Sequence, residues 1–203
     1  MSRHGIGTAG VLALVAGLAF VGGRLSTSYE GNTALALQPE GEAAFEMPGA
    51  TLAPEHETLK AMLGDWEGSV KFKMGEEWME SGGTIHRELA MDGRYVIEHV
   101  VGEMPEGEFH GMGIVGYNTI DKTYESVWIE NMATNMMFAT GSYDKAAKKF
   151  TFKGKMIDPM TGDKVDSISY MDVSDPNKET FEGYAIKKDG TKEKNFEGSF
   201  TRK

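Results

Sequence analysis

Histidines are the first residues to examine for chemistry, because imidazole is the commonest metal ligand in proteins and titrates near neutral pH. The chain has five, at His4, His56, His86, His99 and His110. The last three fall in strand-like segments and would form a metal or haem site only if all three pointed into one pore. The alternative is that they are polar surface residues or satisfied core residues. His86 shares a face with Thr84 and Glu88, which is a solvated pattern, so we predict no metal site and no cofactor.

Arg87 is the most informative charged residue. It alternates with Ile85 and Leu89, so it is expected on the apolar side of its strand. A buried guanidinium needs an anionic partner or an aromatic ring on which to stack. The partner is either a carboxylate of the protein, such as Glu98, or a tryptophan, or the carboxylate of a bound fatty acid or similar amphiphile. The last alternative makes Arg87 a candidate ligand-binding residue.

A methionine-rich stretch with Met132, Met136, Met137 and Phe138 follows Trp128. Methionine is adaptable and lines apolar pockets as readily as it fills cores. A thioether copper site would need regular short spacing with histidine or cysteine nearby, and the stretch lacks it. The two remaining interpretations are core packing and the lining of a ligand cavity. We therefore predict that Trp128, Met136 and Phe138 line or touch the interior.

Motifs for catalysis are missing from the sequence. It contains no nucleophile elbow, no phosphate-binding loop and no histidine pair at metal-ligand spacing on one helix. Cysteine is absent, which excludes disulfides, thiol nucleophiles, a lipobox cysteine and thiolate metal sites. The acidic residues are scattered, as in loops and solvated rims. An enzyme is therefore the third of our functional hypotheses.

The elements that must position these residues begin with a short helix. Residues 54–63 carry an apolar stripe, and Pro54 suits the first helical position. Gly64 suits the left-handed conformation that ends a helix. Trp66 then begins a strict alternation of apolar and polar residues, which is the pattern of a strand with one buried face.

Ten segments show this alternation. They cover residues 66–74, 82–91, 94–103, 109–118, 122–130, 134–143, 149–157, 165–173, 179–187 and 193–202. Turn-forming residues separate them and no helical pattern interrupts them, so the strands must form an antiparallel up-and-down meander. So many strands favour a closed barrel, and a two-sheet sandwich is the alternative.

Closure of the barrel would pair the first strand with the last. Arg202 would then reach the indole of Trp66 and stack on it, a cation–π contact of about 0.5–2 kcal/mol. We predict that Gly64, Trp66 and Arg202 close the base of the barrel.

The helix, the Gly-x-Trp of the first strand and the terminal arginine resemble the lipocalin-like, or calycin, barrels. A longer pattern resembles one bacterial calycin-like family, catalogued as domain of unknown function fifteen-seventy-nine, over about residues 55–203. The residues that carry it are Gly64-Asp65-Trp66-Glu67-Gly68, Gly83-Thr84 with Arg87, Asp92-Gly93-Arg94-Tyr95, Gly113-Ile114-Val115-Gly116-Tyr117-Asn118, Trp128-Ile129-Glu130-Asn131-Met132 with Thr134, Asp158-Pro159-Met160-Thr161-Gly162 and Thr201-Arg202-Lys203. The chain departs from the family pattern at Asn131, where aspartate is expected, and at Ala133, where glycine is expected.

The resemblance implies an all-β fold, a single antiparallel barrel of about 8–10 strands with a short N-terminal helix, and it brings no established activity. Some small barrels of this class bind haem through a histidine near the C-terminus. This chain has no histidine after His110, which counts against haem.

Three regions follow from the composition. Residues 1–26 have a short basic start and an apolar centre, as in a signal peptide or uncleaved signal anchor. Residues 27–53 lack periodicity and are expected to be a flexible linker, and residues 54–203 form the barrel domain. The domain is therefore expected outside the cytoplasm, periplasmic or secreted, with membrane contact only through the N-terminal segment. A net charge of −10 argues against nucleic-acid partners.

Our first functional hypothesis is a binding module that holds a small apolar or amphipathic ligand inside the barrel. The second is a structural or interaction domain of the cell envelope, with a filled barrel and a working surface. Fold alone does not decide between them.

Overall fold

The computed structural model describes residues 47–104 and 107–203. The targeting segment predicted for residues 1–26 and most of the linker predicted for residues 27–53 lie outside these ranges. In the part of the chain that is described, no helix has the length and apolar character needed to cross a membrane.

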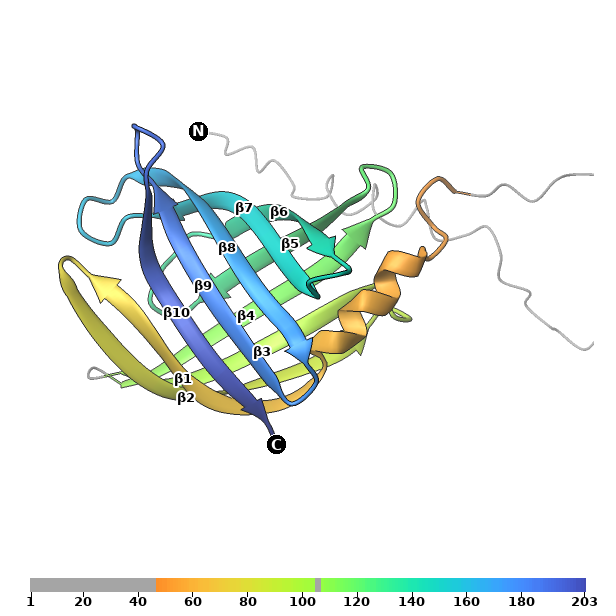
Figure 1. The fold of residues 1–203 in the computed structure, drawn as a ribbon, viewed down its shortest axis with the longest axis horizontal. Helices are drawn as coiled ribbons and strands as arrows, with labels where there is room; N and C mark the ends of the chain where they lie inside the picture. Colours follow the sequence, from red (N-terminus) through yellow and green to blue (C-terminus); the bar gives the residue numbers. More distant parts are fainter. Residues whose placement is uncertain (1–46, 105–106) are drawn as a thin grey trace, which may run out of the picture. The chain divides into compact units, whose positions relative to one another are not determined.

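Ten antiparallel strands form a closed barrel in which each strand pairs with its neighbours in sequence and β1 pairs with β10 (Figure 1). The strands are β1 (Gly64–Met74), β2 (Glu77–Ala90), β3 (Tyr95–Met104), β4 (Gly107–Asn118), β5 (Thr123–Glu130), β6 (Met137–Asp144), β7 (Lys149–Ile157), β8 (Lys164–Asp175), β9 (Lys178–Ile186) and β10 (Lys192–Arg202). The predicted meander and its closure are confirmed, and the sandwich alternative is wrong. Hairpins join each strand to the next, and the pairing of β1 with β10 closes the single sheet on itself.

The predicted helix is present but is wound as a 3-10 helix, η2 (Pro54–Met62). Its ends make the i to i−3 hydrogen bonds of that form, from the His56 amide to the Ala53 carbonyl at 3.0 Å and from the Leu63 amide to the Lys60 carbonyl at 3.3 Å. The Ala53 amide also donates to Nδ1 of His56 at 3.0 Å, which tightens the first turn.

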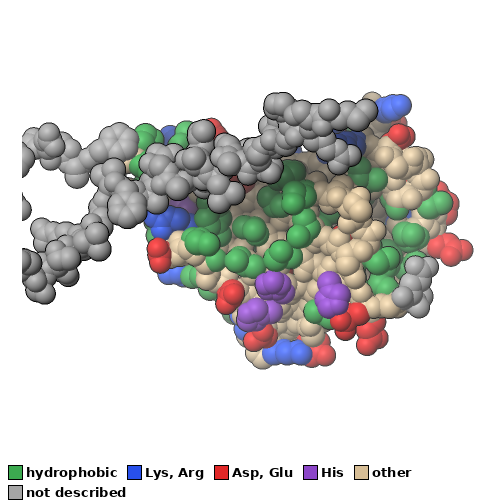
Figure 2. Space-filling model, turned by 180° about the vertical axis from the view of Figure 1, so that it is seen from behind, with side chains coloured by type: hydrophobic (Ala, Val, Ile, Leu, Met, Phe, Trp, Pro, Cys, Tyr) green, Lys and Arg blue, Asp and Glu red, His purple; other side chains and the backbone are tan. Residues whose placement is uncertain are grey.

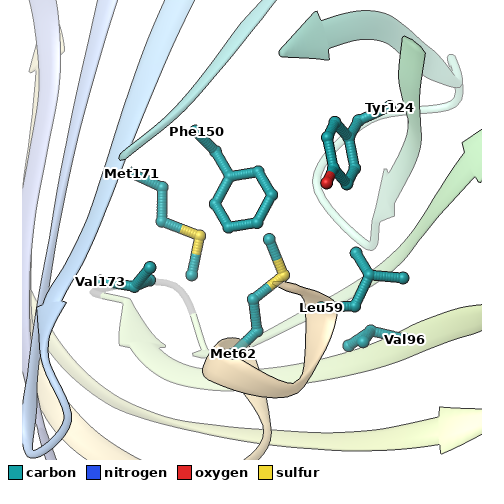
Figure 3. Close-up of a cluster of buried hydrophobic side chains, with 7 residues drawn as sticks. All are labelled: Leu59, Met62, Val96, Tyr124, Phe150, Met171 and Val173. Carbon is teal, nitrogen blue, oxygen red and sulfur yellow. The ribbon is translucent and has the colours of Figure 1, made fainter. Parts of the chain in front are cut away.

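Helix η2 lies against one end of the barrel, where it contributes Leu59 and Met62 to the main core (Figures 1 and 3). Both side chains are buried and meet residues from strands on several sides. The buried members of this cluster are Leu59, Met62, Val96, Tyr124, Phe150, Met171 and Val173. The helix therefore plugs this end of the barrel, which we call the closed end.

Trp66 and Arg202 are direct partners on β1 and β10, next to the plug. The Arg202 guanidinium lies 4.1 Å from the centre of the Trp66 ring, and the indole N–H donates to the Met62 carbonyl at 3.1 Å. Arg202 also donates to the carbonyls of Leu63 and Pro176. Gly64 has φ +112°, and a Cβ there would overlap Nη1 of Arg202. Trp66 and Arg202 thus join the first strand, the last strand and the end of η2.

Candidate binding site in the barrel interior

The interior beyond the closed end is lined by small residues. One row runs across five neighbouring strands from β5 to β9, and its members are consecutive cross-strand partners: Ser126, Ala139, Gly154, Ser167 and Ala185. A similar row crosses β1, β2 and β3 and consists of the cross-strand partners Gly68, Gly83 and Gly102. A Cβ on Gly68, Gly83 or Gly154 would overlap the backbone of a neighbouring strand, so glycine at these positions lets the strands approach closely.

Larger apolar side chains point inward beyond these rows, toward the end of the barrel away from η2. They are Phe72, Met79, Met104, Phe109, Trp128, Met137, Met156 and Phe196. All are only half-buried, whereas several inward residues of the closed end, such as Val96 and Phe150, are fully buried and others there, such as Tyr117 and Phe152, are half-buried. Solvent therefore reaches apolar groups inside this half of the barrel, which we call the open half.

Trp128 lies flat against the wall of the open half. Its ring stacks on that of Phe109, with centroids 6.4 Å apart and planes inclined by 21°. A Cβ on Gly111 would overlap the indole, so glycine there lets the ring approach β4 closely. The indole N–H donates to Oε2 of Glu130 at 2.8 Å. The ring is thus held in place by its neighbours and by one polar contact.

Arg87 is buried at the closed end and is paired with carboxylates of the protein. Its Nη1 donates to both oxygens of Glu179, at 2.7 and 2.9 Å, and its Nε donates to Glu98. Nη1 also reaches the Met62 carbonyl at 3.3 Å, and the guanidinium lies 5.6 Å from the centre of the Phe181 ring. Nη2 is buried without a hydrogen-bond partner among the described residues.

This geometry agrees with the alternative in which Arg87 serves the protein's own carboxylates. The side chains of Arg87 and Glu179 are 2% and 0% exposed, and that of Glu98 is 20% exposed. Burial raises the pKa of the Glu179 carboxyl, and the adjacent Arg87 opposes this shift. The carboxylate of Glu98 is therefore the part of this network that solvent reaches best.

Two of the predicted lining residues do not point into the barrel. Met136 lies in the β5–β6 connection and is 60% exposed, and Phe138 is 62% exposed on the outer face of β6. The prediction that they line the interior is wrong because the odd-numbered residues of β6, such as Met137 and Ala139, are the inward ones. Met137 pairs with Trp128 and takes the inward position instead.

The strand histidines do not converge in a pore. His86 and His99 are partners on the outer faces of β2 and β3, and Nδ1 of His86 lies 2.7 Å from Oδ1 of Asp65. His110 pairs with Glu108 at 2.7 Å, also outside. Among residues 47–104 and 107–203, no three histidine or acidic side chains are grouped to hold a metal ion.

The outer face of β3 to β6 carries an apolar row made of consecutive cross-strand partners, Ile97, Ile114, Val127 and Phe138. Figure 2 shows this side of the molecule, where hydrophobic side chains gather and histidines lie near them. Ile114 is 40% exposed, so part of the row is open to solvent.

Comparisons with known proteins give a family and a fold. A family model described as protein of unknown function (DUF1579) matches residues 51–202. The barrel is similar to the crystal structure of Rv2717c from M. tuberculosis, with TM-score 0.57 and 13% identity, covering 75% of this chain and 99% of that chain. No curated protein sequence matches the chain.

Two further solved structures are more distant. A redesigned β-barrel, b11L5F_LGL, has TM-score 0.40 and 14% identity, covering 72% of this chain and 95% of that chain. The structure of EF1p2_mFAP2b bound to DFHBI has TM-score 0.40 and 11% identity, covering 73% of this chain and 98% of that chain.

Proposed function

Because the chain belongs to the DUF1579 family of proteins of unknown function, we propose a function from its own interior: the barrel binds a small apolar or amphipathic ligand in its open half. The proposal includes export, with the barrel outside the cytoplasm and an N-terminal segment that is either cleaved or kept as an anchor. Export is supported by the uncharged apolar run in residues 5–23.

The observation that carries the binding proposal is the contrast between the two halves of the interior. A barrel that served only as a solid scaffold would have a fully buried apolar cluster in both halves, as the closed end has around Val96 and Phe150. In the open half, aromatic and methionine side chains such as Phe72, Trp128 and Met156 remain half-buried above rows of glycine, alanine and serine. Covering these groups with an apolar ligand would be favourable by about 25 cal/mol per Å².

The methionines support a ligand of variable shape. Met79, Met104, Met137 and Met156 all point inward in the open half. An unbranched thioether side chain adapts to different surfaces at little cost. The site therefore suits a class of related apolar molecules better than one rigid shape.

Native mass spectrometry of the full chain, purified without detergent, tests the proposal directly. We expect a co-purifying small molecule that denaturation releases, or saturable binding of a neutral apolar fluorescent probe when the chain emerges empty. If the chain carries no ligand and also fails to bind the probe, the proposal is wrong.

Two tryptophan variants localise the site. Trp128→Ala removes an inward ring and should weaken probe binding, whereas Trp78→Ala removes an exposed tryptophan on the outer face of β2 and should not. Circular dichroism of both variants checks that each remains folded. Equal loss of binding in the two variants would place the probe elsewhere.

A second candidate function rests on the outer apolar row of β3 to β6. Contiguous exposed apolar area on a sheet commonly marks a protein interface. In this second function the outer face would contact the same face of a second copy of the chain. The row has no charged residue at its centre, so two copies would not repel each other there. Phe138→Glu should then lower the association seen by analytical ultracentrifugation, and a wild-type chain that is monomeric at all concentrations would exclude it.

A further inference from the structure

We infer that the open half selects ligands with a cationic amine head group over those with a carboxylate, an inference that rests on the proposed function. The argument comes from three side chains that surround one part of the β4 wall, Glu98, Trp128 and Glu130. We call this group the acidic aromatic wall.

Gly113 brings the first two of these side chains together. Glu98 and Trp128 are its cross-strand partners on β3 and β5. A Cβ at Gly113 would lie 3.2 Å from Oε1 of Glu98 and 3.4 Å from Cε3 of Trp128. Because glycine has no side chain to cover them, a carboxylate oxygen and an indole edge lie side by side.

Glu130 adds a second carboxylate to the same wall. It is the partner of Gly111 on β4 and is half-buried at an inward position. Only its Oε2 accepts from the Trp128 indole, at 2.8 Å. The other oxygen keeps its capacity for a ligand donor.

The inward cations are already committed at the closed end. Arg87 is 2% exposed and pairs with Glu98 and Glu179, and Arg202 stacks on Trp66 and donates to two carbonyls. No lysine occupies an inward position of the described strands, as their cross-strand register shows. Lys73 and Lys187 are both paired with Glu193. The charged groups that a ligand meets beside Trp128 are therefore acidic.

An ammonium group fits this chemistry. Carboxylates accept hydrogen bonds from it, and the face of a tryptophan ring attracts a cation within about 6 Å of its centre. The hydrocarbon tail would cover the half-buried apolar groups nearby. A carboxylate head group would instead be brought close to two carboxylates without a free cation, which is unfavourable in a partly desolvated site.

This inference reverses the role considered for Arg87 from the sequence. A fatty-acid carboxylate could use Arg87 only by reaching Nη2, which is buried, or by displacing Glu98. Either route would make fatty-acid binding depend on Arg87.

The test compares three twelve-carbon ligands that differ only in head group: dodecylammonium, dodecanol and dodecanoate. Each displaces a neutral fluorescent probe from the full chain at neutral pH, below its micelle-forming concentration. We expect dodecylammonium to bind at least about tenfold more tightly than dodecanoate, with dodecanol between them. Added salt should narrow this difference.

Glu130→Gln and Glu125→Gln form a matched pair. Both lie on β5, but Glu125 is exposed on the outer face. Glu130→Gln should weaken dodecylammonium by about tenfold and leave dodecanol unchanged, since it removes a charge and keeps the side-chain shape. Glu125→Gln should change neither affinity.

The outcomes separate the two proposals. If none of the three ligands and not even the neutral probe binds, the proposed function itself is wrong. If dodecanol binds but dodecylammonium and dodecanoate bind equally, or dodecanoate binds best, only the charge selection is overturned. An unchanged dodecylammonium affinity in Glu130→Gln would also overturn it.

Discussion

At the scale of single residues, Arg87 organises the closed end. It is a buried cation held between Glu98 and Glu179, with a further contact to the last turn of η2. Buried ion pairs rarely stabilise a protein more than apolar residues of similar size, but breaking one is costly because it leaves an unpaired charge. The network is therefore a point at which single substitutions have large effects.

Arg87→Met should lower the free energy of unfolding by about 3–5 kcal/mol, because Glu179 is left buried without its counter-ion. Urea unfolding measures the change. Arg94→Met is the control, since Arg94 is partly exposed, donates to two carbonyls and has only a long ion pair, at 3.9 Å, with the exposed carboxylate of Asp92. Adding Glu179→Gln to Arg87→Met should recover part of the loss, and a double variant as unstable as the single one would contradict this account.

Gly64 and Gly93 allow the backbone strain of replacing a glycine to be separated from the steric overlap of the added Cβ. Both have positive φ, +112° and +86°, but a Cβ on Gly64 would overlap Arg202 whereas a Cβ on Gly93 meets nothing within 4 Å. Gly93→Ala should cost about 1–3 kcal/mol from backbone strain alone. Gly64→Ala should cost more, measured by urea unfolding, and equal losses would show that the Arg202 contact is unimportant.

At the scale of elements, η2 acts as the plug of the closed end, and two of its side chains are in the core. Leu59→Ala and Met62→Ala should each lower the free energy of unfolding by about 2–5 kcal/mol, because each leaves a cavity among packed side chains. Lys60→Ala on the exposed side is the control. Denaturant titration would contradict the plug if all three variants matched wild type.

The strands were predictable from the sequence because alternation with period two is a local signal. It placed Trp66, Arg87 and Trp128 on the inward face, where the structure has them. The signal failed at residues 134–138, where Met136 and Phe138 suggested that the even-numbered positions face inward. The inward position belongs to Met137 because it pairs with Trp128, and the local pattern does not specify this register.

The interior chemistry was less predictable. Glu98 was foreseen as one partner of Arg87, but Glu179 lies 92 residues along the chain and was not. Glu130 gave no signal in the sequence either, since its role depends on glycines of β4 that let Trp128 lie flat. Such contacts arise from closure of the barrel, so only a three-dimensional arrangement reveals them.

At the scale of the whole molecule, two carboxyl groups make the folding stability of the barrel depend on pH in opposite directions. Hydrogen bonds from Lys73 and Lys187 lower the pKa of Glu193 to about 2. A lowered folded-state pKa contributes stability above the ordinary carboxylate range, and this stability is lost as pH falls toward 2. Glu179, whose pKa is raised by burial, does the reverse: its ionisation costs stability as pH rises through the raised value.

Two variants should divide these contributions. Glu193→Gln should flatten the fall in stability between about pH 4.5 and 2, and Glu179→Gln should flatten any decline above pH 4.5. Thermal unfolding followed across this range provides the measurement. If the unfolding temperature of wild type and of both variants changed with pH in the same way, neither carboxyl would contribute to the pH dependence of stability.

The pairing of β1 with β10 also governs when the molecule can form during synthesis. The first strand leaves the ribosome long before its partner exists, because that partner is the last strand of the chain. Contacts between such distant segments slow folding. Until residues 192–202 emerge, the nascent sheet has two open sides that pair readily with other chains. A messenger truncated before the codons of β10 would therefore yield an open sheet with two unpaired edge strands, which is a substrate for quality control.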